Sequence, residues 1–295
     1  MRVRVCPYCY SPEITEKVLI GGPMAQLDND DGTYRCLHCG KSGVPIDFAG
    51  WEEYQEFIDS KMASTEVHSR PILPMLPTLF HGGIEAGSVN ATVVKVTWDG
   101  GLRFGDQRER LQDNWKRAEK VVEGKAACIL DLNGIMEGRP DLDGIQHVLR
   151  RKGEVMLDIG IHHEQDVFDC FTMGASQVLA TSIGMPSFKV FERVLDMTDE
   201  CIPCLCYDDK VQWRRPRGNP TELDDCLSAL KELGFAQVGL MCLDRLGKAN
   251  GPDLRVIDKA TRAGLKVWLA GGVRFEDVPS LPAQVSGVLL DPSFE

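Results

Sequence analysis

Residues 140–160 read PDLDGIQHVLRRKGEVMLDIG, and residues 252–272 read PDLRVIDKATRAGLKVWLAGG. The two stretches align without a gap at an offset of 112 residues (252 − 140), and each runs from Pro-Asp-Leu to a glycine after an apolar segment. A self-similarity of this length indicates that one structural unit is used twice. Each copy has the pattern of a loop, a helix, a strand and a glycine turn.

Strand-like runs recur along the rest of the chain, with helical patterns between most of them, such as Asn114–Val122 and Leu223–Leu233. The alternation predicts an α/β fold, a (β/α)8 TIM barrel built of two half-barrel repeats. The predicted strands are Ala91–Thr97, Ala126–Leu132, Val155–Ile159, Gln177–Thr181, Ile202–Tyr207, Gln237–Asp244, Lys266–Ala270 and Gly287–Leu290.

Two Cys-x-x-Cys pairs lie near the amino terminus, Cys6 with Cys9 and Cys36 with Cys39. Four thiolates at this spacing are typical of a closed tetrahedral site for structural zinc, and so small a segment needs a metal to hold its core. We therefore predict a small β-rich zinc ribbon, with zinc as its cofactor and iron as the alternative.

Three segments follow from these patterns: a zinc ribbon at 1–50, an amphipathic helix and Pro/Gly-rich linker at 51–90, and the barrel at 91–295. Trp51, Tyr54 and Phe57 recur at helical spacing. Because few residues follow the eighth predicted strand, we expect this helix to cover the outside of the barrel next to strands one and eight.

The composition excludes several classes of protein. A net charge of −11 argues against a general nucleic-acid binder, which needs a basic surface. The chain has no apolar run of membrane-spanning length, and its start lacks the apolar core of a signal peptide, so we expect a cytoplasmic protein that does not contact a membrane. Eleven cysteines in that setting favour reduced thiols and metal over disulfides. The basic run 213–217 is either a solvated loop or an anion-binding loop.

Several short motifs point to a known family: DLNGIMEG at 131–138, DIGI at 158–161, Ala180-Thr181, LDRLG at 243–247, GPD at 251–253 and GGVR at 271–274. Through them, residues 91–295 resemble the histidine-biosynthesis barrel family, the ProFAR isomerase and cyclase group, and within it the archaeal-type paralogues. The resemblance implies a TIM barrel that acts on a small phosphorylated metabolite at the carboxyl ends of its strands.

In the isomerase, two aspartates at the ends of strands one and five act as general acid and base. Alignment on the predicted strands puts Thr97 and Cys206 at those positions. Neither side chain can replace a carboxylate unchanged. Asp99 and Asp208 lie two residues further on, so they are either a displaced catalytic pair or turn residues.

A second pair of carboxylates, Asp131 and Asp244, is equivalent in the repeat if one gap is allowed. At the ends of strands two and six they could bind a ribose hydroxyl, an amine or a metal, or each could serve the structure alone. They complete the candidate catalytic residues.

Phosphate binding is only partly retained. The family resemblance implies backbone N–H groups after strands three, four, seven and eight that hold two phosphates. Gly160, Thr181-Ser182 and Gly271-Gly272 fit this role. After strand eight, however, Asp291 would repel a phosphate and Pro292 has no N–H.

Other reactive side chains have simpler explanations. Cys201, Cys204, Cys206 and Cys242 could form a second metal or redox site, but thiols often pack as small apolar groups, which we favour. The adjacent histidines at 162 and 163 point apart at the start of a predicted helix.

Three functions remain open. The first is an enzyme with altered chemistry on a small anionic, phosphorylated or amine-bearing metabolite, which the resemblance associates with one-carbon, tetrahydromethanopterin-type metabolism. The second is a true ProFAR isomerase with a displaced acid–base pair. The third is a non-catalytic barrel that senses a ligand while the zinc ribbon binds a protein partner.

Overall fold

The computed structural model describes residues 2–6, 12–16, 34–37, 42–57, 70–85, 88–104, 126–150 and 153–291. The chain forms two compact units, Met1–Ser69 and Arg70–Glu295. Among the described residues, no helix combines the length and the apolar character needed to cross a membrane.

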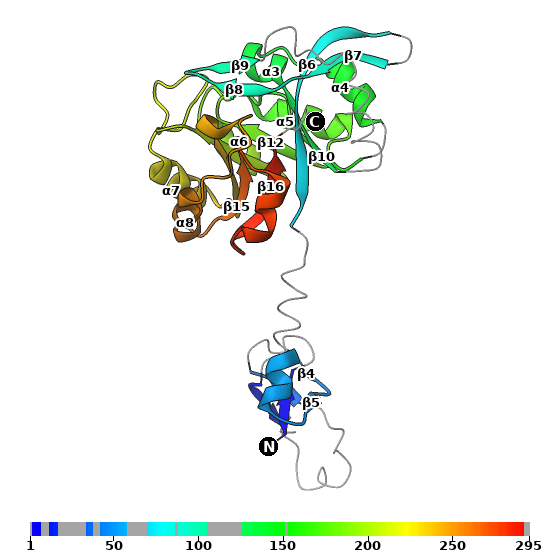
Figure 1. Cartoon of the computed structure of the whole chain (residues 1–295), viewed down its shortest axis with the longest axis vertical. Helices are drawn as coiled ribbons and strands as arrows, with labels where there is room; N and C mark the ends of the chain where they lie inside the picture. Colours follow the sequence, from blue (N-terminus) through cyan, green and yellow to red (C-terminus); the bar gives the residue numbers. More distant parts are fainter. Residues whose placement is uncertain are drawn as a thin grey trace. The chain divides into compact units, whose positions relative to one another are not determined.

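The larger unit is a closed ring of parallel strands (Figure 1), which confirms the expected TIM barrel. The strand β6 (Ile72–Glu85) closes the ring, because it pairs with the last strand on one side and with β10 on the other. The remaining strands follow in chain order: β10 (Ala127–Asp131), β11 (Val155–Asp158), β12 (Gln177–Thr181), β13 (Cys201–Tyr207), β14 (Gln237–Cys242), β15 (Lys266–Ala270) and β16 (Val285–Leu290).

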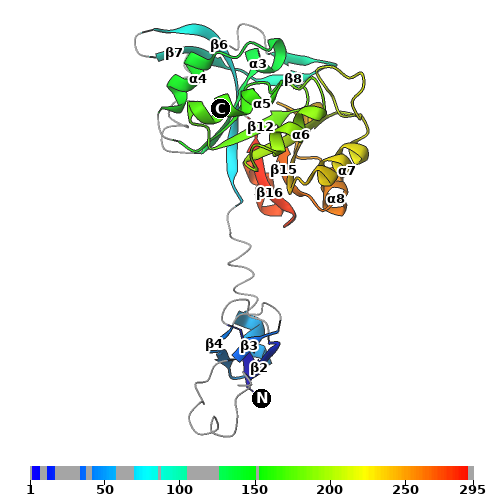
Figure 2. The ribbon, with the colours of Figure 1, turned by 180° about the vertical axis from the view of Figure 1, so that it is seen from behind.

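Helices lie on the outside of the ring (Figure 2), and the strands separate an outer apolar core, which lies under the helices, from an inner one. The repeat is visible in their placement, since α4 and α8 start close to the same point of each copy. The predicted helix Leu223–Leu233 is confirmed as α7, whereas Asn114–Val122 lies outside the described residues. The helical segments are α3 (Leu132–Glu137), α4 (Leu142–Leu149), α5 (Glu164–Met173), α6 (Lys189–Leu195), α7 (Leu223–Leu233), η2 (Leu243–Arg245), α8 (Arg255–Arg262) and η3 (Phe275–Ser280).

The first barrel strand is not where the sequence placed it. The prediction of strand one at Ala91–Thr97 is wrong, and the barrel unit starts at Arg70 instead of residue 91. The prolines at 71, 74 and 77 indicated a linker because proline is rare in central strands. Their carbonyls still accept hydrogen bonds, from Val288 N to Pro71 O at 2.9 Å and from Val94 N to Pro77 O at 2.9 Å.

The second half of β6 leaves the ring and forms an antiparallel hairpin with β7 (Ser88–Val93). The pairing shifts register between Phe80 and Ile84, where Gly82 and Gly83 have φ of 75° and 81°. Such positive φ values favour glycine, which explains the Gly-Gly pair within the strand. The expected linker 51–90 therefore contains a barrel strand and most of a hairpin.

Side chains fill the inside of the ring, as in other barrels of this type. Leu73 and Met75 of β6 meet Cys128, Ile202 and Trp268 in the inner core. The barrel is therefore a packed core without a channel, and any site must lie at the strand ends or on the outside.

The smaller unit holds short antiparallel strands. β1 (Val3–Val5) pairs with β5 (Ile46–Phe48), and β3 (Tyr34–Cys36) pairs with both β2 (Ile14–Glu16) and β4 (Ser42–Gly43). The smaller unit is thus β-rich, and the zinc site of the expected ribbon stays a prediction.

The helix at 51–57 belongs to the smaller unit. Tyr54 and Phe57 pack against the core of Val3, Val5 and Phe48, while Trp51 is 57 % exposed. Tyr54 and Phe57 therefore pack on the apolar face of the β1–β5 sheet of their own unit, and the expectation that this helix covers the outside of the barrel stays a prediction.

Candidate functional site

The first and fifth strands of the ring are β6 and β13. Their inward positions at the carboxyl ends hold Pro77 and Cys206. Pro77 pairs with Leu130 of β10, and Cys206 pairs with Met241 of β14. Leu130 is followed by Asp131, which precedes α3, and Met241 is followed by Cys242, which precedes η2. The two pairs therefore occupy equivalent positions in the two halves of the barrel.

This register corrects the alignment that put Thr97 in strand one. Thr97 lies in β8 (Val96–Trp98), outside the ring. The correct residue, Pro77, has no ionisable group at all, and Cys206 is fully buried. The acid–base pair of the isomerase therefore has no counterpart at these two positions.

The space between these strand ends is small and apolar. A cavity of about 20 Å³ remains there, which is room for about one water molecule. It has no polar lining apart from Thr181, and its wall comprises Pro77, Val96, Leu102, Leu130, Leu132, Ile135, Thr181, Ile183, Met241 and Leu246.

A hairpin of β8 and β9 (Leu102–Phe104) closes this end of the barrel. Val96 is buried in the inner core, and a Cβ at Gly247 would lie 2.1 Å from the Val96 carbonyl oxygen, so the loop after β14 packs directly on the hairpin. Trp98 Nε1 donates a hydrogen bond to Asp208 Oδ2 at 3.0 Å, which ties the hairpin to the end of β13.

The candidate displaced pair, Asp99 and Asp208, lies at the turn of the β8–β9 hairpin and just after β13. Asp99 is exposed at the hairpin turn. Asp208 also accepts from Lys210 N at 3.1 Å and from Gln212 Nε2 at 2.8 Å. Burial opposes ionisation of Asp208, but these hydrogen bonds outweigh it and lower its pKa. A carboxylate held in its charged form by several donors is a weak base.

Asp131 and Asp244 occupy different environments, which the repeat did not reveal. Asp131 ends β10, is fully buried and caps α3 through a hydrogen bond from Asn133 N at 3.1 Å. Burial raises its pKa to about 7, against the backbone N–H groups that lower it. Asp244 is exposed within η2, and Cys242 takes the structural place of Asp131 in the second half.

The predicted phosphate loop of the first half is filled by a carboxylate of the chain. Asp158 Oδ1 accepts from Gly160 N at 2.7 Å, and its Oδ2 accepts from Thr181 N at 3.2 Å and from the Thr181 hydroxyl. Ser182 Oγ in turn accepts from Cys206 N at 2.9 Å. The donors expected to hold phosphate therefore bind the protein itself.

The second phosphate loop is filled in the same way. Asp291 Oδ2 accepts from Gly272 N and from Gly247 N, each at 2.9 Å. Gly271 and Gly272 have φ of 84° and 80°, and a Cβ at Gly271 would lie 2.2 Å from the Cys242 carbonyl oxygen. The Gly-Gly pair is thus required by a tight turn, with Asp291 bound where an anion would bind.

Sequence reasoning missed Asp158 as a binding group for these donors. A signal was present in the repeat, because Asp158 corresponds to Ala270 while the glycines after them, Gly160 and Gly272, are shared. Because Asp158 occurs in the first copy only and lies two residues before Gly160, it is a local candidate to accept a hydrogen bond from Gly160 N. For Asp291, the sequence predicts repulsion of a phosphate but not the hydrogen bond that its carboxylate accepts from Gly272 N.

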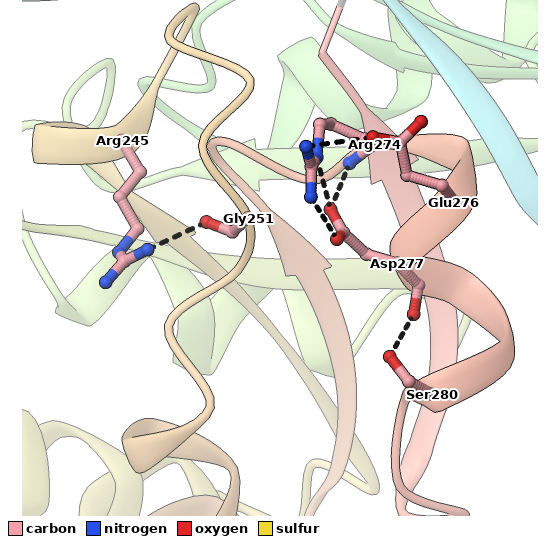
Figure 3. A network of polar contacts seen from close by, with 6 residues as sticks. All are labelled: Arg245, Gly251, Arg274, Glu276, Asp277 and Ser280. Carbon is pink, nitrogen blue, oxygen red and sulfur yellow. Dashed lines mark hydrogen bonds and ion pairs between the residues drawn. The ribbon is translucent and has the colours of Figure 1, made fainter.

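Two arginines near these loops also bond within the protein (Figure 3). Arg274 contacts Glu276 Oε1 at 2.8 Å and Asp277 Oδ1 at 2.8 Å. Arg245 Nη1 donates to Gly251 O at 3.0 Å. These contacts hold the loops after β14 and β15.

The basic run after β13 is partly structural. Trp213 is buried and donates to Pro220 O at 2.7 Å, and Arg214 Nη1 donates to Ile135 O at 2.9 Å. Arg215 and Arg217 are exposed. Nearby, burial and the charge of Arg214 lower the pKa of His162, which favours its neutral form.

The cysteines fall into two groups. The barrel buries four of them, Cys201, Cys204, Cys206 and Cys242. Burial raises the pKa of the Cys201 and Cys242 thiols, so these two side chains stay neutral, as expected of thiols that pack as apolar groups. In the smaller unit, Cys6 and Cys36 are buried, while Cys9 and Cys39 lie outside the described residues. Within the described part of the chain, no cluster of three or more metal-binding side chains occurs.

Comparison with models of known protein families identifies a relationship for this chain. The family model described as histidine biosynthesis protein matches residues 89–291, which is more than half of the chain. The matched range begins after the barrel portion of β6, so the first strand of the ring lies outside it. No curated protein matches the sequence.

Proposed function

We propose that this chain, which belongs to the histidine biosynthesis protein family, acts on a small anionic metabolite by a chemistry other than ProFAR isomerisation. The observation that carries the proposal is the pair Pro77 and Cys206 at the ends of strands one and five. Without carboxylates there, these two positions cannot supply the general acid and base that the isomerase reaction uses.

Two further features support a changed substrate. The cavity between the strand ends is about 20 Å³, far smaller than the 300–1,000 Å³ that is typical of small-molecule sites. Asp158 and Asp291 already bind the N–H groups that would hold the two phosphates. A substrate with two phosphates would have to displace both carboxylates and open the β8–β9 hairpin.

The alternatives are less well supported. A true isomerase with a displaced pair would rely on Asp99 and Asp208, and Asp208 is held by three donors. A non-catalytic ligand sensor with a partner-binding ribbon agrees with the closed barrel end but leaves the family relationship without a reaction. The link to one-carbon metabolism stays a prediction that no described residue tests.

A direct assay of the isomerase reaction tests the proposal. The purified full-length protein is expected to give no turnover of ProFAR, and its gene is expected not to restore growth of a histidine auxotroph that lacks the isomerase. A genuine isomerase expressed from the same vector serves as the control. Growth, or turnover that is lost in Asp208→Asn, would contradict the proposal and support the displaced pair.

A further inference from the structure

Three loops meet around the side chain of Asp291 at the carboxyl end of the barrel. Gly247 and Ala249 belong to the loop after β14, Gly272 follows β15, and Asp291 follows β16. The Asp291 carboxylate accepts from Gly247 N and Gly272 N, each at 2.9 Å, and also from Ala249 N. Backbone N–H groups that converge in this way form a site for an anion. We call these three N–H groups the anion nest.

The internal repeat indicates that this position attracts an anion in both halves. Gly272 corresponds to Gly160 at the offset of 112 residues (272 − 160), and Gly160 N donates to Asp158 Oδ1 at 2.7 Å. The two carboxylates come from different places, because Asp158 ends β11 whereas Asp291 follows β16, the neighbour of β15. The residue equivalent to Asp158 is Ala270. Two carboxylates of unrelated origin at equivalent N–H groups indicate that the donors select the anion.

Contacts that do not involve the carboxylate hold the nest in shape. Gly251 N donates to Gly272 O at 2.8 Å, which bonds the loops after β14 and β15 to each other. Arg245 Nη1 donates to Gly251 O at 3.0 Å (Figure 3). Gly247 packs closely on the backbone of the β8–β9 hairpin. We therefore expect the three N–H groups to keep their directions when the carboxylate is removed.

The nest borders the solvent. Asp291 is 9 % exposed, and residues 248–250 and Lys95 are exposed. Burial raises the pKa of Asp291 to about 6, while hydrogen bonds from the nest and the charge of Lys95 act in the opposite direction. A cation therefore acts on the place that the carboxylate occupies, and we expect a small anion to reach the N–H groups once that place is empty.

We infer that Asp291 determines the specificity of the barrel for its ligand: its carboxylate occupies an intact anion site and excludes phosphate from the loops after β14 and β15. The ligand is then a small metabolite that has no phosphate group at this end of the second half. A phosphate there would lack the N–H donors and would lie beside a negative charge. This inference rests on the proposed function and deepens it, because it names a group that the anionic ligand does not place in these loops.

Asp291→Ala tests the inference because it empties the nest. The melting temperature of the barrel in the full-length protein is measured with inorganic phosphate, and with chloride at the same ionic strength as the reference. At about 20 mM phosphate we expect the melting temperature of Asp291→Ala to rise by about 3 °C, as for a dissociation constant of about 5 mM. The unchanged chain should show no rise over chloride.

Two further variants serve as controls. Asp291→Asn keeps a side-chain oxygen that accepts from the nest, so it should gain no response to phosphate. Val288→Ala removes buried methyl groups of β16 without releasing an N–H donor, so it reports the effect of lower stability alone. If Asp291→Ala aggregates, Asp291→Ser takes its place, because its hydroxyl group is too short to fill the nest and it should also gain the response.

The outcomes separate this inference from the proposed function. No rise with phosphate in a folded Asp291→Ala or Asp291→Ser variant overturns the inference and leaves the result of the isomerase assay unaffected. An equal rise in Val288→Ala, or in the unchanged chain, also overturns it, because phosphate would then stabilise the barrel without the emptied nest. Turnover of ProFAR by the unchanged chain overturns the proposed function even if Asp291→Ala binds phosphate.

Discussion

Asp131, Asp158 and Asp291 hold the loops at the carboxyl end of the barrel, and all three are buried. Burial raises the pKa of Asp131 to about 7 and that of Asp158 and Asp291 to about 6, although hydrogen bonds from backbone N–H groups act in the opposite direction. Each carboxyl therefore binds its proton more tightly in the folded chain than in the unfolded chain.

This difference predicts an unusual dependence of stability on pH. A group whose pKa is raised by folding stabilises the fold at low pH, and the contribution is lost as the pH rises through the folded value. For Asp291 the loss between pH 5 and pH 8 should be about 1 kcal/mol. Urea unfolding at the two pH values checks this: Asp291→Asn should show less loss than the unchanged chain.

The same substitution at an exposed position, Asp99→Asn, serves as the control for the removal of one carboxyl group. An unchanged pH dependence in Asp291→Asn would contradict a raised pKa for Asp291. It would mean that the N–H donors of Gly247 and Gly272 hold this carboxylate in its charged form.

At the scale of elements, β6 determines whether the ring closes. Residues 72–74 pair with β16 and residues 75–78 pair with β10, while Leu73 and Met75 are buried in the inner core. The prolines in this strand made it look like a linker, although each retains a carbonyl that can accept a hydrogen bond. A chain that lacks β6 would leave two long strand edges without partners.

Two fragments test this role. A fragment that begins at Arg70 should unfold cooperatively on heating, because it keeps the whole ring. A fragment that begins at Ala91 should aggregate or remain partly unfolded, because the edges of β10 and β16 are exposed. Circular dichroism and gel filtration provide the measurement, and equal cooperativity of the two fragments would show that β6 is dispensable.

At the scale of the whole molecule, the two units have separate apolar cores. The core of the smaller unit contains Val3, Val5 and Phe48, which is little for a segment of this length, and Cys6 and Cys36 are buried in the same unit. We propose that zinc bound by Cys6, Cys9, Cys36 and Cys39 supplies the missing stability.

Elemental analysis should find about one zinc per chain, and Cys36→Ser should remove it. Because the barrel has its own core, its thermal transition should stay the same in this variant. Cys226→Ser, which changes a buried thiol of the barrel, should keep the zinc and serves as the control. Full zinc content in Cys36→Ser would contradict the predicted ligand set, and iron in place of zinc would change the metal but leave the ligands.

The sequence by itself determined the repeat at 140–160 and 252–272, strands such as Gln177–Thr181, and the glycine turn at 271–272, since these features depend on local periodicity and on backbone angles. The tertiary structure decided that β6 is the first strand and that Asp158 and Asp291 bind Gly160 and Gly272. Closure of the ring and the partners of buried carboxylates depend on contacts between residues far apart in the chain, and local patterns do not encode which of several candidates makes the contact.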